Sequence, residues 1–498
     1  MDSPPRLPSR SAYGAKVDVN LAIVKVHFHG DFMDQLSRTP ELLVQLDRKH
    51  GETLSAQLER QLREAIRAGR LKPETTLPST RALAGQLGVS RGLVVGAYAQ
   101  LGAEGYLVLR RGATPRVARA VGQPVVSRPE PHEQLPRYNL RPDLPDYGSF
   151  PREEWARSYR AALKRASDQE LAYGDTRGSL ALRAALVSYL GRVRGVAGGP
   201  EHTFVCGGFA QAVGLLCTVL RRSGRTTIGV ENPGHAVIRE IVARTGLKPV
   251  PIRVDGEGID VGALDRSRAE AVLVTPAHQF PTGVVLSPER RAALLEWARR
   301  RDAFVAEDDY DAEFRYDRAP VGALKGLAPE RVAYLGSASK TLAPTLRLGW
   351  LVAPSALVRT LAEQQLYTVI APPRLEQLAF ADFLERGELD RHLRRMRVRY
   401  RRRRDVLVGA LKHELPDARV RGIAAGLHVV VMLPAGTDER RVLAEARERE
   451  IGLYGLGEHR VASRGEPGLL LGYAVAREPA IRAAVRALAE AVEAASRG

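Results

Sequence analysis

Residues 303–353, AFVAEDDYDAEFRYDRAPVGALKGLAPERVAYLGSASKTLAPTLRLGWLVA, decide the fold of this chain. Three short apolar runs within them, at 303–306, 332–335 and 348–353, predict buried strands. The first run ends in acidic residues, and the second ends in a Gly-Ser-x-Ser-Lys turn. Ligands of α/β sheets bind beyond the carboxyl ends of the strands, so we expect both endings to face one crevice.

The residues at these strand ends indicate a particular chemistry. Lys340 can form an imine with an aldehyde, and Asp308 can hold a pyridine nitrogen protonated. Together these are the requirements of pyridoxal 5'-phosphate (PLP), a cofactor that serves as an electron sink. Taken alone, the Ser-x-Ser-Lys turn is more often solvated, and Asp-Asp-Tyr is an ordinary acidic strand end. Their order, followed by Arg-x-Gly-Trp, favours a cofactor site.

The segment SASKTLAPTLRLGW, residues 337–350, resembles the cofactor-lysine segment of the fold-type I aminotransferases. The resemblance implies an α/β large domain with a mostly parallel sheet and a small C-terminal α/β subdomain. It also implies that Lys340 forms a Schiff base with PLP, that Asp308 pairs with the pyridinium nitrogen, and that Tyr310 bonds the phenolic oxygen. The implied phosphate donors are Ser337, Ser339 and Arg347.

Composition sets broad limits on the function. The chain has 498 residues, enough for two or three domains, and no run of 18 apolar residues that predicts a membrane span. We expect no signal peptide, because the N-terminus lacks the pattern of basic, apolar and small-residue regions. We expect a cytoplasmic protein, because Cys206 and Cys217 show neither a disulfide framework nor metal-ligand spacing. No metal site is expected. The formal net charge of +18 favours polyanionic partners, although an arginine-rich composition alone can produce it.

Residues 77–112, LPSTRALAGQLGVSRGLVVGAYAQLGAEGYLVLRRG, predict a DNA-binding motif. Ser79 caps a short helix that stops at Gly88, and Ser90 caps a second helix. A glycine between two short helices is typical of a helix-turn-helix, and the apolar hairpin after Gly105 predicts a wing. The second helix is expected to bury one face, formed by Val94, Ala97, Tyr98 and Leu101.

Charge supports DNA as the ligand of this region. Residues 41–118 hold 12 Lys or Arg against 7 Asp or Glu. The first turn of the second helix offers free amides to a phosphate. A small protein-interaction module with a solvated basic face is the alternative. The segment resembles the winged helix-turn-helix of the GntR family, however, and the resemblance implies DNA contacts by Ser79, Arg81, Ser90, Arg91 and Arg110 or Arg111. The wing departs from the family's Gly-x-Gly-Thr and reads Arg-Gly-Ala-Thr-Pro.

The domain organisation follows from these segments. We expect a disordered lead at 1–40 (with Met33 a second candidate start), a winged helix-turn-helix at 41–118, a linker at 119–140 and an aminotransferase-like domain at 141–498. Phe150-Pro151 and Trp155 resemble the docking segment of MocR-type regulators, which join a GntR head to an aminotransferase-like body. Read this way, the resemblance covers residues 42–498.

Further cofactor contacts are implied by this resemblance, some with altered residues. Tyr173 takes the place of a tyrosine that reaches the cofactor phosphate of the partner in a dimer, and His235 stands where an aromatic ring usually stacks on the cofactor. An ordinary turn and a surface loop are the respective alternatives. The turn before the helix at 209 lacks the usual hydroxyl, so we expect phosphate contacts from the amides of Gly208, Phe209 and Ala210.

Two features of the pocket favour a regulator over a working aminotransferase. The segment His278-Gln279-Phe280-Pro281-Thr282-Gly283 closely matches the MocR-type pattern, in which His278 is expected at the cofactor and Phe280 replaces the usual asparagine. No arginine stands in the obvious slot for a substrate carboxylate, which holds Glu458; Arg460 is the nearest candidate.

Three interpretations remain at this point: a PLP-dependent transcriptional regulator, a working aminotransferase with an accessory head, and a DNA-binding protein whose body only dimerises. The intact Lys340, Asp308, Tyr310 and Arg347 set and the near-complete head favour the first. Its expected partners are operator DNA, PLP or a small amine or amino-acid effector, and a second copy of the chain. The resemblance implies that the two copies are arranged head-to-tail. The basic run 392–404 predicts a helix with a solvated charged face.

Overall fold

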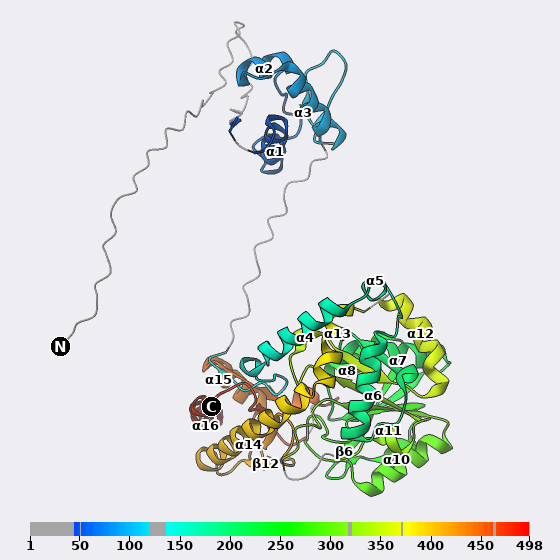
Figure 1. Cartoon of the computed structure of the whole chain (residues 1–498). Helices are drawn as coiled ribbons and strands as arrows, with labels where there is room; N and C mark the ends of the chain where they lie inside the picture. The colour runs from blue at the N-terminus through cyan, green and yellow to red at the C-terminus, as the bar shows by residue number, and fades with distance from the viewer. Residues whose placement is uncertain are drawn as a thin grey trace, which may run out of the picture. The chain divides into compact units, whose positions relative to one another are not determined.

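The computed structural model describes residues 44–49, 51–119, 136–316, 321–369, 372–461 and 465–497. The chain divides into two compact units, residues 1–133 and 134–498, which we call the head and the body (Figure 1). The predicted lead at 1–40 and residues 120–135 of the predicted linker lie outside the described residues.

The described residues of the head form three helices and a short antiparallel hairpin. Ser79 accepts a hydrogen bond from the amide of Ala82, and Gly88 ends the second helix in the left-handed conformation at φ 61°. Ser90 accepts from the amide of Leu93 and so caps the third helix. Both predicted caps are therefore present, and they set the bounds of α1 Leu54–Arg67, α2 Thr80–Leu87, α3 Arg91–Ala103, β1 Leu107–Val108 and β2 Arg116–Val117.

One face of α3 forms the centre of the head. Its buried residues are the four predicted from the helical period, Val94, Ala97, Tyr98 and Leu101. They pack in one cluster with residues of α1 and α2, and the Tyr98 hydroxyl donates to the Pro78 carbonyl oxygen at 3.0 Å. The hairpin pairs Leu107 with Val117 and adds both side chains to this core. The head is thus a winged helix-turn-helix.

The body is built on an eight-stranded sheet of order β4-β11-β10-β9-β8-β5-β6-β7. The strands from β10 to β6 run parallel, whereas β11 and β7 pair antiparallel with their neighbours. The three strands expected from residues 303–353 are present as β9, β10 and β11. The strand bounds are β4 Thr203–Cys206, β5 Thr227–Asn232, β6 Lys248–Asp255, β7 Gly258–Ile259, β8 Ala271–Val274, β9 Phe304–Asp309, β10 Val332–Ser337 and β11 Gly349–Val352.

Helices cover both faces of this sheet, as expected for buried parallel strands. Successive residues of β9 alternate between two cores: Phe304 packs with α7 and α12, and Val305 packs with α10. The helices of this part are α4 Arg152–Arg165, α5 Asp168–Leu171, α6 Leu180–Arg194, α7 Phe209–Arg222, α8 Ala236–Arg244, α9 Val261–Arg266, α10 Pro288–Arg300, α11 Leu324–Leu327, α12 Ser355–Val369 and α13 Arg374–Glu385, with 3-10 turns η1 Tyr147–Ser149, η2 Pro200–His202 and η3 Pro344–Leu346.

The predicted C-terminal subdomain is a four-stranded antiparallel sheet of order β12-β13-β16-β15. A separate two-stranded pair joins β3 to β14, and it contains residues 138 and 139, which the sequence analysis assigned to the linker. The Tyr138 amide donates to the Glu450 carbonyl oxygen, so the body begins before residue 141. The elements are β3 Tyr138–Asn139, α14 Glu388–Glu414, β12 Arg419–Arg421, β13 His428–Met432, α15 Glu439–Glu448, β14 Ile451–Gly452, β15 Tyr454–Gly455, η4 Gly457–His459, β16 Gly468–Gly472 and α16 Glu478–Ser496.

Candidate functional site

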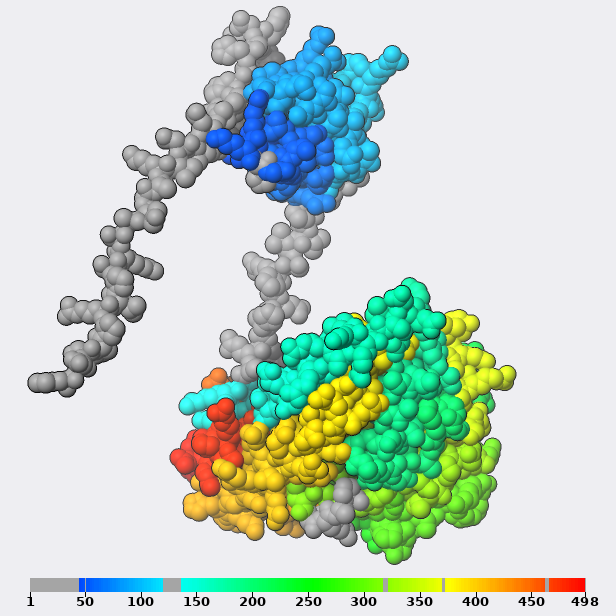
Figure 2. Space-filling model, in the orientation of Figure 1, coloured from blue at the N-terminus to red at the C-terminus, as the bar shows by residue number. Residues whose placement is uncertain are grey.

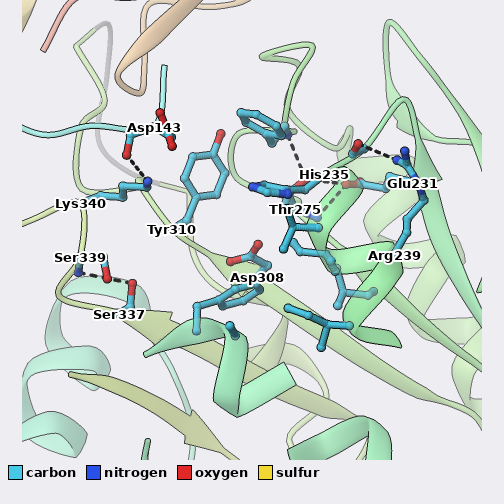
Figure 3. A pocket seen from close by; sticks show the side chains of 18 of the residues that line it. Asp143, Glu231, His235, Arg239, Thr275, Asp308, Tyr310, Ser337, Ser339 and Lys340 are labelled. Atoms are coloured by element: carbon cyan, nitrogen blue, oxygen red, sulfur yellow. Dashed lines mark hydrogen bonds between the residues drawn. The ribbon is translucent and has the colours of Figure 1, made fainter. Parts of the chain in front are cut away.

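A cavity of about 270 Å³ lies beyond the carboxyl ends of β5, β9 and β10 (Figure 3). This is the place that the strand endings predicted. The cavity gathers most of the predicted cofactor residues although they come from distant parts of the chain. Those that line it are Phe209, Ala210, His235, Asp308, Tyr310, Ser337, Ser339, Lys340 and Arg347.

The amine of Lys340 lies at one side of the cavity (Figure 3). Its Nζ donates a hydrogen bond to the main-chain oxygen of Asp143. Burial lowers the pKa of Lys340, while the carboxylates of Asp143, Asp311 and Asp308 act in the opposite direction. A buried lysine with a lowered pKa loses its proton more easily, and only the neutral amine can attack an aldehyde.

Asp308 presents an unsatisfied acid to the same cavity. The residue is 5 % exposed, and within the described chain its Oδ1 is buried without a hydrogen-bond partner. Burial raises the pKa of Asp308 well above its usual range, and the neighbouring Asp309, Glu231 and Asp311 raise it further. A buried carboxyl in this state lacks a cationic donor. The protonated ring nitrogen of PLP is such a donor, so the acid fits the cofactor.

The neighbouring Asp309 points away from the cavity because side chains alternate along a strand. Its Oδ2 accepts from Arg194 Nε at 2.6 Å and from the Tyr334 hydroxyl at 2.7 Å. Arg194 and Asp309 are both almost completely buried. This pair ties β9 to the end of α6 and to β10, and thereby fixes the strand end that carries Asp308.

Another group of lining residues is suited to an anion. Ser337 ends β10, and Arg347 adopts a left-handed conformation at φ 50° that turns the chain back toward β11. A Cβ atom at Gly208, whose φ is 98°, would lie 3.2 Å from the Arg347 guanidinium. No side chain caps α7, so the amides of its first turn, at Phe209 and Ala210, are free to bind a phosphate. The hydroxyls, guanidinium and amides together match a phosphate group.

His278 does not line the cavity, contrary to its predicted place at the cofactor. It is buried behind Tyr310, with its Nδ1 2.9 Å from Asp311 Oδ2 and 3.0 Å from the Tyr310 hydroxyl. These contacts use the imidazole to orient Tyr310. His278 is therefore a positioning residue in this structure, and Tyr310 alone of the two reaches the cavity.

Three other predicted residues also lie outside the cavity lining. Gly208 lies beneath Arg347 and shapes the anion end, as described above. Arg460 donates instead to the Glu466 carbonyl oxygen at 2.7 Å, so it does not take the place of a substrate-carboxylate arginine. Tyr173 is 78 % exposed. Its predicted contact with a partner's cofactor stays a prediction, since one chain cannot test it.

The cavity also contains polar residues that the sequence analysis missed. Glu231 is the second-last residue of β5, and its carboxylate accepts from the Thr275 hydroxyl at 2.5 Å and from Gln279 Nε2 at 3.1 Å. Burial raises the pKa of Glu231 to about 7. The strand-end rule that found Asp308 also applies to Glu231. Arg239 donates to the carbonyl oxygens of Gly234 and His459. No sequence signal marked Asp143.

The predicted DNA contacts of the head lie on its surface. Ser79 and Ser90 both use their hydroxyls as helix caps. The four predicted arginines are exposed, and their side chains make no hydrogen bond or ion pair with the described residues; they are Arg81, Arg91, Arg110 and Arg111. Their guanidinium groups are thus available to an external ligand.

Comparisons with known proteins identify both units. The GntR family of bacterial regulatory proteins matches residues 54–117, and the aminotransferase class I and II family matches residues 146–450. The chain is 31% identical to the probable rhizopine catabolism regulatory protein MocR of Rhizobium meliloti, over 90% of this chain and 95% of that protein. It belongs to the MocR-type regulators of the GntR family.

Other relatives agree with this family. The pyridoxine biosynthesis transcriptional regulator PdxR of Corynebacterium glutamicum is 33% identical over 91% of this chain and 99% of its own length. The body resembles the crystal structure of Pyrococcus horikoshii kynurenine aminotransferase, with a TM-score of 0.67, 26% identity, and coverage of 73% of this chain and 92% of that one. The expected fold class is therefore confirmed.

The described residues contain neither a membrane-spanning helix nor a metal-binding cluster. No helix among them is long and apolar enough to cross a membrane. No group of three or more His, Cys, Asp or Glu residues in the same part of the chain has the arrangement of a metal site.

Proposed function

We propose that this MocR-type protein binds operator DNA through its head and responds to PLP, or to an amine that reacts with PLP, in the body cavity. PLP carries an aldehyde that reacts with primary amines. In the proposal Lys340 supplies the amine of the protein, Asp308 holds the ring nitrogen, Tyr310 bonds the ring oxygen, and Arg347 with Ser337 and the α7 amides holds the phosphate. The location is the cytoplasm.

One observation carries the link between cavity and DNA. Pro142 and Asp143 line the cavity, and Lys340 donates to the Asp143 carbonyl oxygen. These residues follow directly after β3, the first strand of the body that the chain enters from the head. Engagement of Lys340 by a ligand removes its hydrogen bond to Asp143. The contact therefore gives Pro142 and Asp143, at the start of the body, a reason to differ between the free and the ligand-bound states. A ligand can shift an equilibrium only through such a difference.

The effector is either PLP itself or an amine adduct of it. The name of the Corynebacterium relative, a pyridoxine biosynthesis regulator, supports the cofactor as its own signal. The position of Arg460 outside the cavity lining supports PLP as the effector, because the cavity then lacks the predicted arginine for an amino-acid carboxylate.

We also propose that the working form is a homodimer arranged head-to-tail, in which each body receives Tyr173 from its partner. The exposure of Tyr173 in the single chain supports this.

The experiment that tests the proposal is a visible absorption spectrum of the purified protein with PLP, followed by DNA titrations with and without the cofactor. A bound-cofactor band and a cofactor-dependent DNA affinity are expected. A protein without the band would have a body that serves only for dimerisation.

A working aminotransferase is the second candidate, and the 29% identity to an aromatic-amino-acid aminotransferase of Thermococcus litoralis favours it. We expect slow or undetectable transamination, because Phe280 lines the cavity in place of the usual asparagine and substrate orientation is a large part of such catalysis. Steady turnover of common amino acids with keto acids would reverse this ranking.

A further inference from the structure

The helix α14 carries an unusual concentration of positive charge. Its 27 residues, ELDRHLRRMRVRYRRRRDVLVGALKHE, contain ten Lys or Arg against four Asp or Glu. The body cavity uses none of these residues. Such a helix usually has a charged face that contacts only solvent. The partners of its arginine side chains show whether this face can also bind a ligand.

The arginines of α14 fall into two groups. The first group has partners within the body: buried Arg403 pairs with Asp146, and Arg391 and Arg402 pair with Glu388 and Glu478. The same group contains Arg397, Arg399 and Arg404. The second group is exposed and has no acidic partner within 4.0 Å among the described residues; it comprises Arg394, Arg395 and Arg401. The second group lies opposite the buried face formed by Leu389, Leu393, Met396, Tyr400 and Leu407.

The neighbouring helix α16 extends this charge. Arg482 is exposed and lines, with Arg401 and Arg402, a groove of about 560 Å³ beside α14. Figure 2 shows the surface of α14, in yellow to orange, open on one face of the body. Asp405 is the acidic residue that lines this groove. We call Arg394, Arg395, Arg401 and Arg482 the arginine surface.

We propose that the arginine surface binds the backbone phosphates of the DNA that the head recognises, so that the body adds a second, sequence-independent contact. At a rise of 1.5 Å per residue, Arg394 and Arg401 are separated by about 10 Å along the helix. One DNA strand carries a phosphate about every 3.4 Å of axis, so this length faces about three phosphates. The guanidinium fork is also suited to phosphate oxygens. The inference rests on DNA binding by the head, which brings a polyanion to the same chain.

The test is the salt dependence of duplex binding by the full chain. The logarithm of the binding constant falls as the logarithm of the salt concentration rises, and each phosphate contact contributes about −0.9 to this slope. In the triple variant R394Q/R395Q/R401Q the slope should be less negative by about 2–3. Its matched control is R440Q/R441Q/R447Q on α15, which removes three exposed arginines from a helix that also carries Glu439, Glu445 and Glu448. The control should change the slope by less than 1.

The outcomes separate the alternatives. An unchanged slope in the α14 variant, or an equal change in both variants, overturns the proposal. An unchanged slope together with an altered molar mass in light scattering assigns the surface to contact between protein chains instead. If the native chain binds no duplex at all, the proposed function itself fails. The cofactor band and the melting temperature should match the native values in both variants, since every substituted residue is exposed.

Discussion

The head and the body place their functional residues in opposite environments. Arg81 and Arg91 of the head project from the surface and take no part in its core. In the body, Asp308 and Ser337 are almost completely buried at strand ends. These arginines can therefore be removed without cost to the fold, whereas the cavity residues influence binding and stability together.

The two units also differ in how their sites are assembled. The head is formed by neighbouring helices whose ends are fixed by local caps at Ser79 and Ser90. The cavity collects residues from position 142 to position 347, and their meeting depends on the parallel sheet. Substitutions in the head and in the body should consequently differ in how they change ligand binding and stability.

The largest effect is expected at β9, where two adjacent acids should respond differently. Asp308→Ala should weaken PLP binding by about 10²–10³-fold, the equivalent of about 3–4 kcal/mol, as for the loss of one partner of a buried ion pair. It should not lower the melting temperature of the cofactor-free protein, because the native Oδ1 has no partner. The measurements are equilibrium dialysis of PLP and thermal melting.

The matched control is Asp309→Ala, which leaves Arg194 buried without its carboxylate. This variant should destabilise the cofactor-free body by several kcal/mol. Equal melting temperatures for the two variants would contradict the assignment of one acid to binding and the other to the fold.

A pH-dependent effect is expected at Glu231. The folded protein raises the pKa of Glu231 to about 7 by burial, so the folded state holds this proton more tightly than the unfolded chain. The stability that it contributes is present at low pH and is lost as the pH rises through 7. Because glutamine does not titrate, Glu231→Gln should gain about 2–3 kcal/mol relative to the native protein between pH 5 and pH 8.

Chemical denaturation at both pH values measures this difference. Glu240→Gln, at an exposed position on α8, is the control and should show no pH-dependent gain. A pH-independent difference at Glu231 would mean that its carboxyl keeps an ordinary pKa.

A smaller effect is expected in the head. Arg91→Ala should weaken operator binding by about 1–3 kcal/mol, through loss of a base or phosphate contact, and should leave the cofactor spectrum unchanged. Arg70→Ala removes another exposed arginine beyond the end of α1 and should have little effect on binding. Gel-shift titrations at fixed salt compare the two variants, and unaltered binding by Arg91→Ala would remove α3 from the DNA interface.

The smallest effects concern two glycines of the head that have open space around them. Gly88→Ala should cost about 1 kcal/mol, because an alanine at φ 61° adopts the disfavoured left-handed conformation. Gly96→Ala, inside α3, should instead stabilise the head by about 0.5–1 kcal/mol. Thermal melting of the head measures the stability change of both variants. A change of stability in the same direction for both substitutions would contradict the turn geometry.

The sequence predicted those features that rest on local signals. The caps at Ser79 and Ser90, the buried face of α3, and the strands β9 and β10 all follow from spacing of a few residues, and the structure confirms them. The resemblance to aminotransferases added the residues of the cavity, and most of them converge there.

The features that were not predicted depend on contacts between distant segments. His278 lies behind Tyr310 because its imidazole contacts the Asp311 carboxylate. This contact joins residues 33 positions apart, so the spacing of residues in the sequence does not reveal it. Arg239, and not Arg460, reaches the cavity, and both are simply arginines near a turn in the sequence. Strand β3 has only two residues, too few to show a period, so the predicted linker extends too far toward the C-terminus.

The central claim is that Lys340 couples the cavity to DNA binding, and DNA titrations of the native protein and of Lys340→Ala, each with and without PLP, test it most directly. The native affinity should change with PLP by about 5–150-fold, the usual range for coupled sites. The variant should bind DNA through its intact head with an affinity that PLP does not alter. A variant that keeps the full response to PLP would contradict the account.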